Sequence, residues 1–215
     1  MNLPDCPLCL GRETRALLEV DVRRYFRCEQ CQGRFLDPSQ HPTREEEQRE
    51  YDQHQNQIDD PGYRRFLSTL TNPLLERLPV RSEGLDYGCG PGPALAAMCE
   101  AHGHSMTLFD PIYRNNESAL RRQYDFITCT EVAEHFHQPG IEFQRLSDLL
   151  RPGGLLGVMT RFQTDDSRFA TWHYRRDPTH VFFYREDTMR WLAQKRDWIL
   201  ELLPPTVALF QKKGA

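Results

Sequence analysis

The sequence predicts an α/β fold: a Rossmann-like, doubly wound parallel sheet that follows a small cysteine-rich ribbon and a helical linker. Three observations predict it. Strand and helix patterns alternate after residue 80, two Cys-x-x-Cys pairs lie within the first 40 residues, and a polar helix-forming stretch separates these two regions. We therefore divide the chain into a ribbon (1–40), a linker or lid (41–80) and a sheet domain (81–215).

Length and composition limit the classes of protein that this chain can be. Its 215 residues suffice for one core and a small appendage, and its net charge of −4 argues against nonspecific nucleic-acid binding. No apolar run approaches the roughly 18 residues that cross a bilayer, and Met1 to Asp5 shows no basic segment leading into an apolar one. We expect a cytoplasmic protein with no membrane partner, and the composition leaves its oligomeric state open.

The ribbon contains four cysteines in two pairs, about 18 residues apart. Two such pairs can bring four thiolates together tetrahedrally, and a cytosolic setting favours a metal over disulfides. Short strands are expected over 16–22 and 25–27, and a metal is needed to stabilise so small a unit. The predicted ligands of a structural zinc ion are Cys6, Cys9, Cys28 and Cys31. The other cysteines lie in apolar segments and are predicted core residues: Cys89, Cys99 and Cys129.

The linker is polar and helical. A run rich in Glu and Gln begins after Pro42 and is broken at Pro61, so two or three helices are expected. Few apolar residues occur before residue 60. Tyr51 and Ile58 therefore stand out as candidate lid contacts.

The sheet domain alternates between strands and helices. Such alternation indicates a parallel, doubly wound sheet, whose ligands bind beyond the carboxyl ends of the strands. The segment 115–122 is a poor strand candidate. The predicted strands are 85–87, 105–109, 126–129, 155–160, 198–202 and 207–211, and the predicted helices are 94–101, 141–150 and 186–195.

A glycine-rich turn follows the first of these strands. Glycine lets the backbone approach a ligand closely, and the amides at the start of the next helix favour a polar or anionic group. No Lys-Ser/Thr follows, which excludes a phosphate loop, and Gly88, Gly90 and Gly92 alternate rather than follow GxGxxG. The turn predicts a cofactor site, and Asp110 at the end of the second strand is placed to accept ribose hydroxyls.

Together these segments resemble the class I S-adenosylmethionine (SAM) methyltransferases over residues 81–215. The nearest likeness is to the broad group with Glu-x-x-Glu-His after the fourth strand, and the Arg-Pro-Gly-Gly turn at 151–154 is equally typical of it. A nicotinamide-dependent oxidoreductase remains the alternative, and no acidic residue can be placed to read the adenine amine. The resemblance implies SAM as cofactor, bound by Asp86, Gly88, Cys89, Gly90, Gly92, Asp110, Thr130 and Glu131.

The Glu131-to-His135 segment carries the candidate catalytic residues. On a helix, Glu131, Glu134 and His135 would project from one face, where they could bind a divalent metal or supply a general base. The pattern resembles two metal-assisted families, the ubiquinone-biosynthesis O-methyltransferases and the 3′-terminal 2′-O-methyltransferases of small RNAs. The second resemblance implies His180 as a fourth metal ligand. Metal binding, base catalysis by His135 or His180, and mere positioning all remain open.

The region from Phe169 to Tyr184 mixes aromatic and basic residues. It can either form a substrate wall or pack over the sheet, and Phe183 and Tyr184 are predicted core residues.

The expected function is methyl transfer to an O or N atom of a small-molecule acceptor. The alternative is an RNA methyltransferase that uses the ribbon for nucleic-acid contact, including metal-assisted 2′-O-methylation. The ribbon's six arginines are balanced by six acids and the linker is acidic, which disfavours RNA. A third reading is noncatalytic, with the ribbon as an interaction module on a scaffold.

Overall fold

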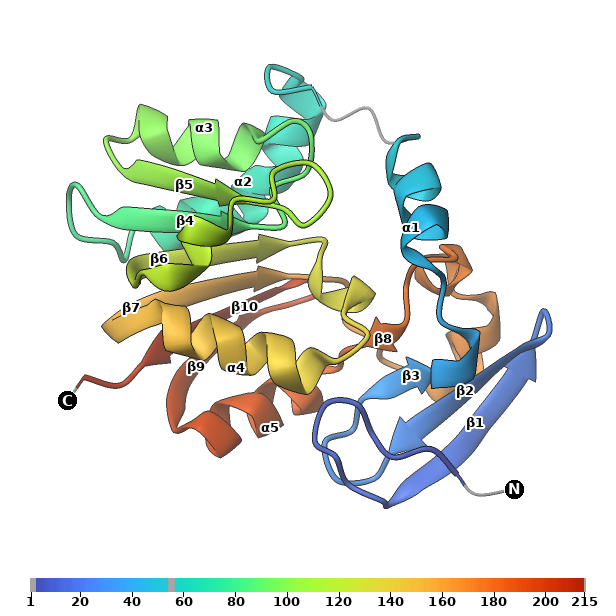
Figure 1. The fold of residues 1–215 in the computed structure, drawn as a ribbon. Coiled ribbons are helices and arrows are strands. Elements are labelled where there is room, and N and C mark those ends of the chain that lie inside the picture. Colours follow the sequence, from blue (N-terminus) through green and yellow to red (C-terminus); the bar gives the residue numbers. More distant parts are fainter. Residues whose placement is uncertain (1–2, 54–56, 215) are drawn as a thin grey trace.

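The computed structural model describes residues 3–53 and 57–214, and the rest of the predicted ribbon, linker and sheet domain lies outside these ranges. A six-stranded sheet in the order β5-β4-β6-β7-β10-β9 forms the larger half (Figure 1). Among the described residues, no helix has the length and apolar character to span a bilayer. The strands are β4 (Glu83–Tyr87), β5 (Ser105–Phe109), β6 (Tyr124–Thr130), β7 (Leu150–Met159), β9 (Trp198–Leu203) and β10 (Val207–Lys212).

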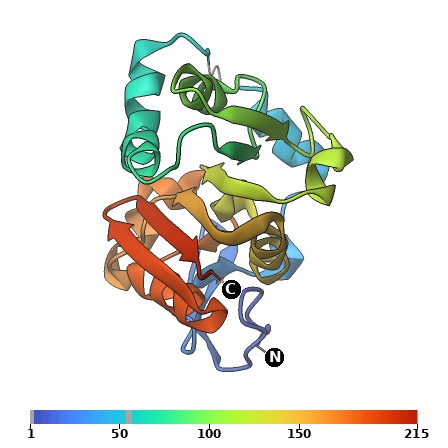
Figure 2. The same ribbon diagram turned by 90° about the vertical axis from the view of Figure 1, so that its left-hand side faces the viewer.

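Helices cover both faces of this sheet, which confirms the doubly wound fold. In Figure 2, α2 lies on one side of the sheet and α4 on the other. Alternate residues of β7 explain this, since Leu155 and Met159 join the core under α2 and α3 while Leu156 and Val158 join the core on the opposite face. The helices are α2 (Pro61–Leu75), α3 (Ala94–Ala101), α4 (Pro139–Leu149) and α5 (Glu186–Arg196).

The sheet departs from the predicted parallel arrangement at one strand. Strand β10 pairs antiparallel with both β7 and β9. Only residues 204–206 separate β9 from β10, and a parallel pair needs a crossover of a dozen or more residues. The weak candidate at 115–122 forms no strand, since a short 3₁₀ helix, η2 (Glu117–Arg121), occupies it.

The ribbon is a second, antiparallel sheet, and one of its strands comes from the later part of the chain. Its order is β1-β2-β3-β8. The strands are β1 (Thr14–Val20), β2 (Arg23–Cys28), β3 (Arg34–Leu36) and β8 (Phe182–Phe183). The first two lie close to the predicted ranges, whereas the β3–β8 ladder was not predicted. Strand β8 comes from the region between β7 and α5, so the sheet domain supplies the fourth strand of the ribbon sheet.

The aromatic region around Phe169 packs against the ribbon. Phe169 and Phe183 contact Tyr25 of β2, with ring centroids 5.1 and 6.1 Å away. Phe183 and Tyr184 are fully buried, which confirms them as core residues. Of the two alternatives for this region, packing accounts for these aromatic residues.

Two helices form the linker. Helix α1 (Arg44–Tyr51) begins with a capping box between Thr43 and Glu46, and none of its residues is buried. Helix α2 begins at Pro61, with Asp60 as its N-cap. The predicted break at this proline is therefore the start of the second helix.

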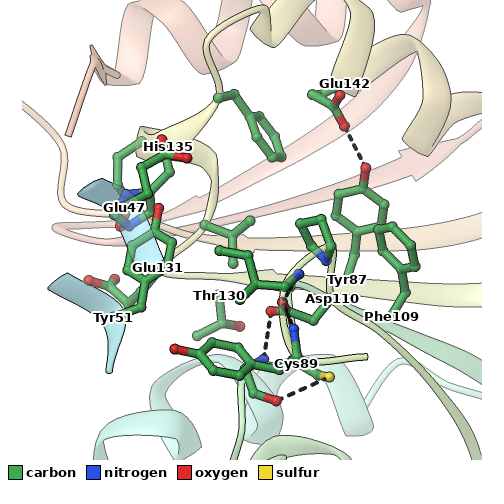
Figure 3. Close-up of a pocket in the computed structure, with 18 of the residues that line it drawn as sticks. Glu47, Tyr51, Tyr87, Cys89, Phe109, Asp110, Thr130, Glu131, His135 and Glu142 are labelled. Carbon is green, nitrogen blue, oxygen red and sulfur yellow. Dashed lines mark hydrogen bonds and ion pairs between the residues drawn. The ribbon is translucent and has the colours of Figure 1, made fainter. Parts of the chain in front are cut away.

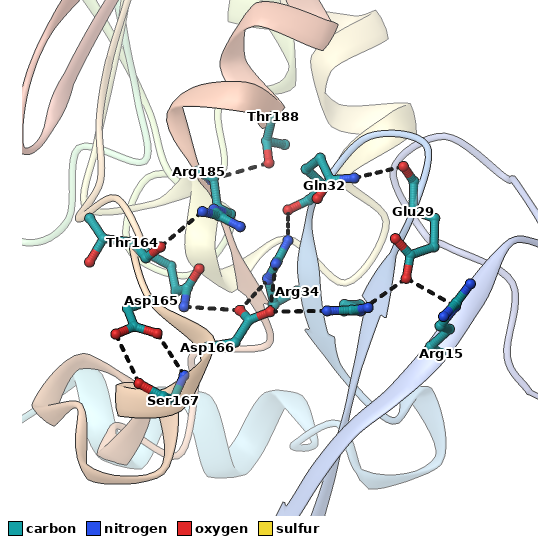
Figure 4. Close-up of polar contacts among 12 residues, drawn as sticks. Arg15, Glu29, Gln32, Arg34, Thr164, Asp165, Asp166, Ser167, Arg185 and Thr188 are labelled. Carbon is teal, nitrogen blue, oxygen red and sulfur yellow. Dashed lines mark hydrogen bonds and ion pairs between the residues drawn. The ribbon is translucent and has the colours of Figure 1, made fainter.

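A buried ion pair joins β3 to the segment after β7 (Figure 4). Arg34 donates from Nε and Nη2 to the two carboxylate oxygens of Asp166, each at 2.8 Å. The Arg34 side chain is 2% exposed and that of Asp166 is 26% exposed. The bidentate pair therefore fixes both the spacing and the orientation of the two segments.

We expect the loss of Asp166 to destabilise the protein more than the loss of Arg34. Asp166→Ala leaves a buried guanidinium without its carboxylate and should lower the free energy of unfolding by about 3–5 kcal/mol. Arg34→Met leaves a carboxylate that water can reach, and should cost less. Urea unfolding measures both, with Arg190→Met in the exposed Arg190–Glu186 pair as a control that changes stability by less than about 1 kcal/mol. Equal losses from the two variants would contradict this account.

Candidate active site

A cavity of about 1110 Å³ lies at the carboxyl ends of β4, β5 and β6, beneath α1. Figure 3 shows Glu47, Tyr51, Glu131 and His135 at one end of it and Tyr87, Phe109 and Glu142 at the other. Asp86 and Gly92 lie outside its lining. The predicted site residues that line it are Gly88, Cys89, Gly90, Asp110, Thr130, Glu131, Glu134, His135 and His180.

The glycine turn is fixed to the end of the neighbouring strand. The amides of Gly88 and Cys89 donate to the carbonyl of Phe109, at 2.8 and 3.1 Å. Gly88 has a φ of +81°, and a Cβ there would lie 2.4 Å from Val132. A Cβ on Gly90 would meet no atom within 4 Å, so this part of the turn is open to a ligand.

Asp110 already accepts three backbone hydrogen bonds. Its Oδ1 accepts from the amides of Ile112 and Tyr113, at 2.8 and 2.9 Å, and its Oδ2 accepts from Gly90 at 3.0 Å. A carboxylate offers about four lone-pair sites. Asp110 therefore holds the glycine turn in place and keeps one acceptor site, on Oδ2, for a ligand.

Asp86 lies behind the turn and is 4% exposed. Its Oδ1 accepts from the hydroxyl of Thr128 at 2.8 Å. Burial raises the pKa of Asp86 to about 6, and the charge of Asp110 adds to this. A carboxyl group is thus kept in an environment that disfavours its charged form.

The prediction of one helical face for Glu131, Glu134 and His135 is wrong. Only Ala133–His135 forms a 3₁₀ turn, η3, while the amide of Glu131 still bonds to the carbonyl of Met159 at 2.8 Å. Glu131 therefore directly follows β6, with a φ of +52°. Burial and the neighbouring charge of Glu134 raise the pKa of Glu131 to about 9.

Tyr174 joins the two glutamates. Its hydroxyl donates to Oε1 of the fully buried Glu134 at 2.5 Å and lies 3.3 Å from Oε2 of Glu131 and 3.1 Å from the hydroxyl of Thr160. Oε2 of Glu134 is buried without a hydrogen-bond partner. Sequence reasoning missed Tyr174, because the aromatic residues of its region show no periodicity that tells which one faces the strand ends.

Two histidines present their Nε2 atoms to Glu134. His135 Nδ1 donates to the carbonyl of Thr179 at 3.1 Å and His180 Nδ1 to that of Tyr174 at 2.6 Å, and a carbonyl can only accept. Their Nε2 atoms lie 4.0 and 3.9 Å from Oε1 of Glu134. Ligand atoms of these three residues lie within 4.8 Å of one another, and Glu131 is not in that group.

Helix α1 covers the cavity through contacts on both of its sides. Glu47 pairs with Nε2 of His137 at 2.8 Å, and the ring of Tyr51 lies edge-on to His135 at 5.2 Å. On the other side, Arg44 donates to the carbonyl of Pro111 at 2.6 Å. Of the two predicted lid contacts, Tyr51 lines the cavity, whereas Ile58 is 41% exposed and lies outside the lining.

The four ribbon cysteines meet at one point. Their sulfur atoms all lie within 4.8 Å of one another, with Cys6 to Cys31 and Cys9 to Cys28 each at 3.5 Å. A tetrahedral zinc ion with Zn–S bonds of about 2.3 Å requires sulfurs roughly 3.8 Å apart. The cluster therefore has the size of a four-thiolate zinc site.

A family model of methyltransferase domains matches residues 53–202, which is more than half of the chain. The chain belongs to this methyltransferase family. A search of the curated proteins found no match to this methyltransferase.

Among solved structures, the methyltransferase is similar in fold to 1,6-didemethyltoxoflavin-N1-methyltransferase of Burkholderia thailandensis, whose structure contains 1,6-didemethyltoxoflavin and S-adenosylhomocysteine. The TM-score is 0.50 at 16% identity, covering 72% of this chain and 80% of that one. A protein of Galdieria sulphuraria, proposed to be a sarcosine dimethylglycine methyltransferase, gives the same TM-score and identity over 70% of this chain and 86% of that one. An O-methyltransferase family protein of Burkholderia thailandensis gives 0.48 at 15% identity, covering 73% of this chain and only 61% of that one.

We expect Asp86 to make the stability of the methyltransferase depend on pH. The folded state raises its pKa from 3.8 to about 6, so its ionisation disfavours folding as the pH rises from 4 to 7. Asp86→Asn removes this effect. Relative to the wild type, the variant should gain about 2.4 kcal/mol of unfolding free energy between pH 4 and pH 7 in urea titrations. If the unfolding free energies of the two proteins change equally with pH, burial does not raise the pKa of Asp86.

Proposed function

We propose that this methyltransferase uses SAM and transfers the methyl group to an N or O atom of a small-molecule acceptor. The observation that carries the proposal is one continuous cavity. It joins the open glycine turn and Asp110 to Glu131, His135 and His180. The proposed nucleoside site and the proposed proton acceptors would share this space.

The donor fits the nucleoside half of this cavity. Gly90 leaves room where a side chain would stand, and the free acceptor site on Oδ2 of Asp110 suits a ribose hydroxyl. Phe109 and Phe136 supply apolar surface for the adenine base, and Phe109 lies at the end of the cavity opposite His135. Glu131 and Glu134 place carboxyl groups near the expected position of the sulfonium, whose positive charge would stabilise their ionised forms.

The acceptor half suits the removal of a proton. SAM supplies an activated methyl group when bound, so the protein must align the acceptor and take up its proton. The hydrogen bonds from Nδ1 leave Nε2 of His135 and His180 as proton acceptors. Burial lowers the pKa of His180, which keeps it neutral and able to accept a proton at pH 7.

The charge of the cavity favours a small molecule over RNA. Its lining has six carboxyl side chains against two guanidinium groups, whereas phosphate contacts need a basic surplus. An RNA ligand would also bind far more weakly at moderate than at low salt, which a salt titration distinguishes. The acids are Glu47, Asp110, Glu131, Glu134, Glu142 and Asp177, and the bases are Arg44 and Arg145.

Calorimetry with SAM and S-adenosylhomocysteine (SAH) tests the donor site. Burial and the neighbouring charge of Glu134 raise the pKa of Glu131, so the pair of glutamates holds a proton at pH 7.5, and the sulfonium should lower that pKa. We expect about one proton to be released when SAM binds and a smaller fraction with SAH, whose sulfur is neutral. Titrations in phosphate and Tris, which differ in ionisation enthalpy, give the number of protons.

Glu131→Gln is the matched control, and it should make the proton release with SAM equal to that with SAH. If neither ligand gives heat or shifts the melting point, the proposed function is wrong. If both bind with equal proton release in the wild type, only the pairing of Glu131 with the sulfonium is wrong.

We also propose two metal sites. The four ribbon cysteines would hold a structural zinc ion. The group formed by Glu134, His135 and His180 fits a second divalent cation, because both imidazoles are oriented through Nδ1 and Oε2 of Glu134 is a buried acceptor without a partner. A cation there would act as a Lewis acid on the acceptor and would favour the metal-assisted alternative.

Metal analysis separates the two sites. The purified chain should retain one zinc ion, and Cys28→Ser should lose it. Cobalt added to the zinc-loaded chain should give a second visible spectrum that His180→Gln abolishes and that His102→Gln, which alters an exposed histidine at the carboxyl end of α3, preserves. No cobalt spectrum in the wild type would leave the two histidines as bases only.

A further inference from the structure

Val181 connects the ribbon to the catalytic loop through its backbone. Its carbonyl accepts from the amide of Leu36 in β3, and its amide donates to the carbonyl of Glu134, each at 2.9 Å. One peptide unit away lies His180. A displacement of β3 therefore acts on both Glu134 and His180.

Phe182 is seated on the second cysteine knuckle. A Cβ on Gly33 would lie 2.3 Å from Cζ of Phe182, so the ring occupies the space that any side chain at position 33 would need. The carbonyl of Gly33 accepts from the amide of Cys28 at 2.9 Å, and the Phe182 ring stacks with Phe35 at 6.4 Å. The shape of this knuckle thus sets the position of Phe182.

The first cysteine knuckle contacts the start of α4, the helix that follows the loop carrying Glu134 and His135. The amide of Gly140 donates to the carbonyl of Pro7 at 3.2 Å, and a Cβ on Gly140 would lie 2.6 Å from the carbonyl oxygen of Leu8. Gly140 belongs to the first turn of α4 and follows His137 by three residues. The first knuckle therefore contacts the helix that follows Glu134 and His135, and the second contacts the strand that follows His180.

The segment that carries His180 has little other regular structure. Between β7 and α5, the described chain forms only two 3₁₀ helices and the two-residue strand β8. Strand β8 pairs with β3 and has no other partner in the sheet. The ribbon is therefore its source of strand pairing.

We propose that Gly33 and Phe182 are positioning residues, through which the cysteine ribbon holds His180 in its Nδ1-protonated orientation toward Glu134. The ribbon, none of whose described residues lines the cavity, then acts on the acceptor pocket through the segment that carries His180. The functional meaning of His180 rests on the proposed function, but its orientation can be measured without an acceptor.

Long-range ¹H–¹⁵N spectra of the full zinc-loaded chain, labelled at histidine, report the tautomer of each imidazole. His180→Gln identifies the His180 signals. We expect Gly33→Ala, whose added methyl must displace the Phe182 ring, and Phe182→Ala to lose the Nδ1-protonated pattern of His180. Both variants should retain zinc and should bind SAH within about twofold of the wild type, because the donor site lies on other strands.

Phe210→Ala is the matched control, since Phe210 is equally buried but lies on β10. It should lower the melting temperature and leave the His180 signals unchanged. Unchanged His180 signals in folded, zinc-containing Gly33→Ala or Phe182→Ala would overturn the proposal, as would an equal change in Phe210→Ala. If Phe182→Ala does not fold, Gly33→Ala and Phe182→Leu decide the matter. Absence of SAH binding in the wild type would refute the proposed function and not this one.

Discussion

The close approach of two carboxyl groups, Glu131 and Glu134, governs the centre of this structure. Glu134 is fully buried and Glu131 is half-buried in the cavity wall, and the hydroxyl of Tyr174 lies between them. Two negative charges so placed disfavour each other, so one of the groups holds a proton until a cation arrives. A sulfonium or a divalent ion satisfies that requirement, and an anionic ligand does not. The preference of the cavity for a cationic ligand follows from these two adjacent carboxyl groups.

The two glutamates, Tyr174 and His180 come from three separate segments of the chain. Strand β6 ends just before the first glutamate, the short turn η3 carries the second, and the segment before β8 brings the tyrosine and His180. Parallel strands end at a common edge of the sheet, which explains the first two. The third depends on the ribbon, since β8 pairs with β3 and Arg34 holds Asp166 beside it. The ribbon thus contacts the segment that brings His180 to the cavity.

Sequence reasoning succeeded where the information is local. Strand periodicity, the spacing of Gly88 and Gly90, and the paired cysteines each lie within a few residues, and they predicted the doubly wound sheet and the cluster of four sulfurs. It failed where pairing is long-range, because nothing near Phe182 indicates a partner almost 150 residues earlier. It also failed for Glu131, since spacings of three and four residues suit a helix, yet strand pairing with β7 continues up to this position.

The cover over the cavity has no buried residue of its own. Helix α1 is held by Arg44, Glu47, Asp52 and the edge of one aromatic ring, and these contacts can be exchanged for water at small cost. Its detachment removes no fully buried side chain of α1 from a core. A spent nucleoside as large as SAH can thus depart while both cores stay intact. Turnover in such an enzyme is expected to respond to ionic strength through the rate of release, even for an uncharged acceptor.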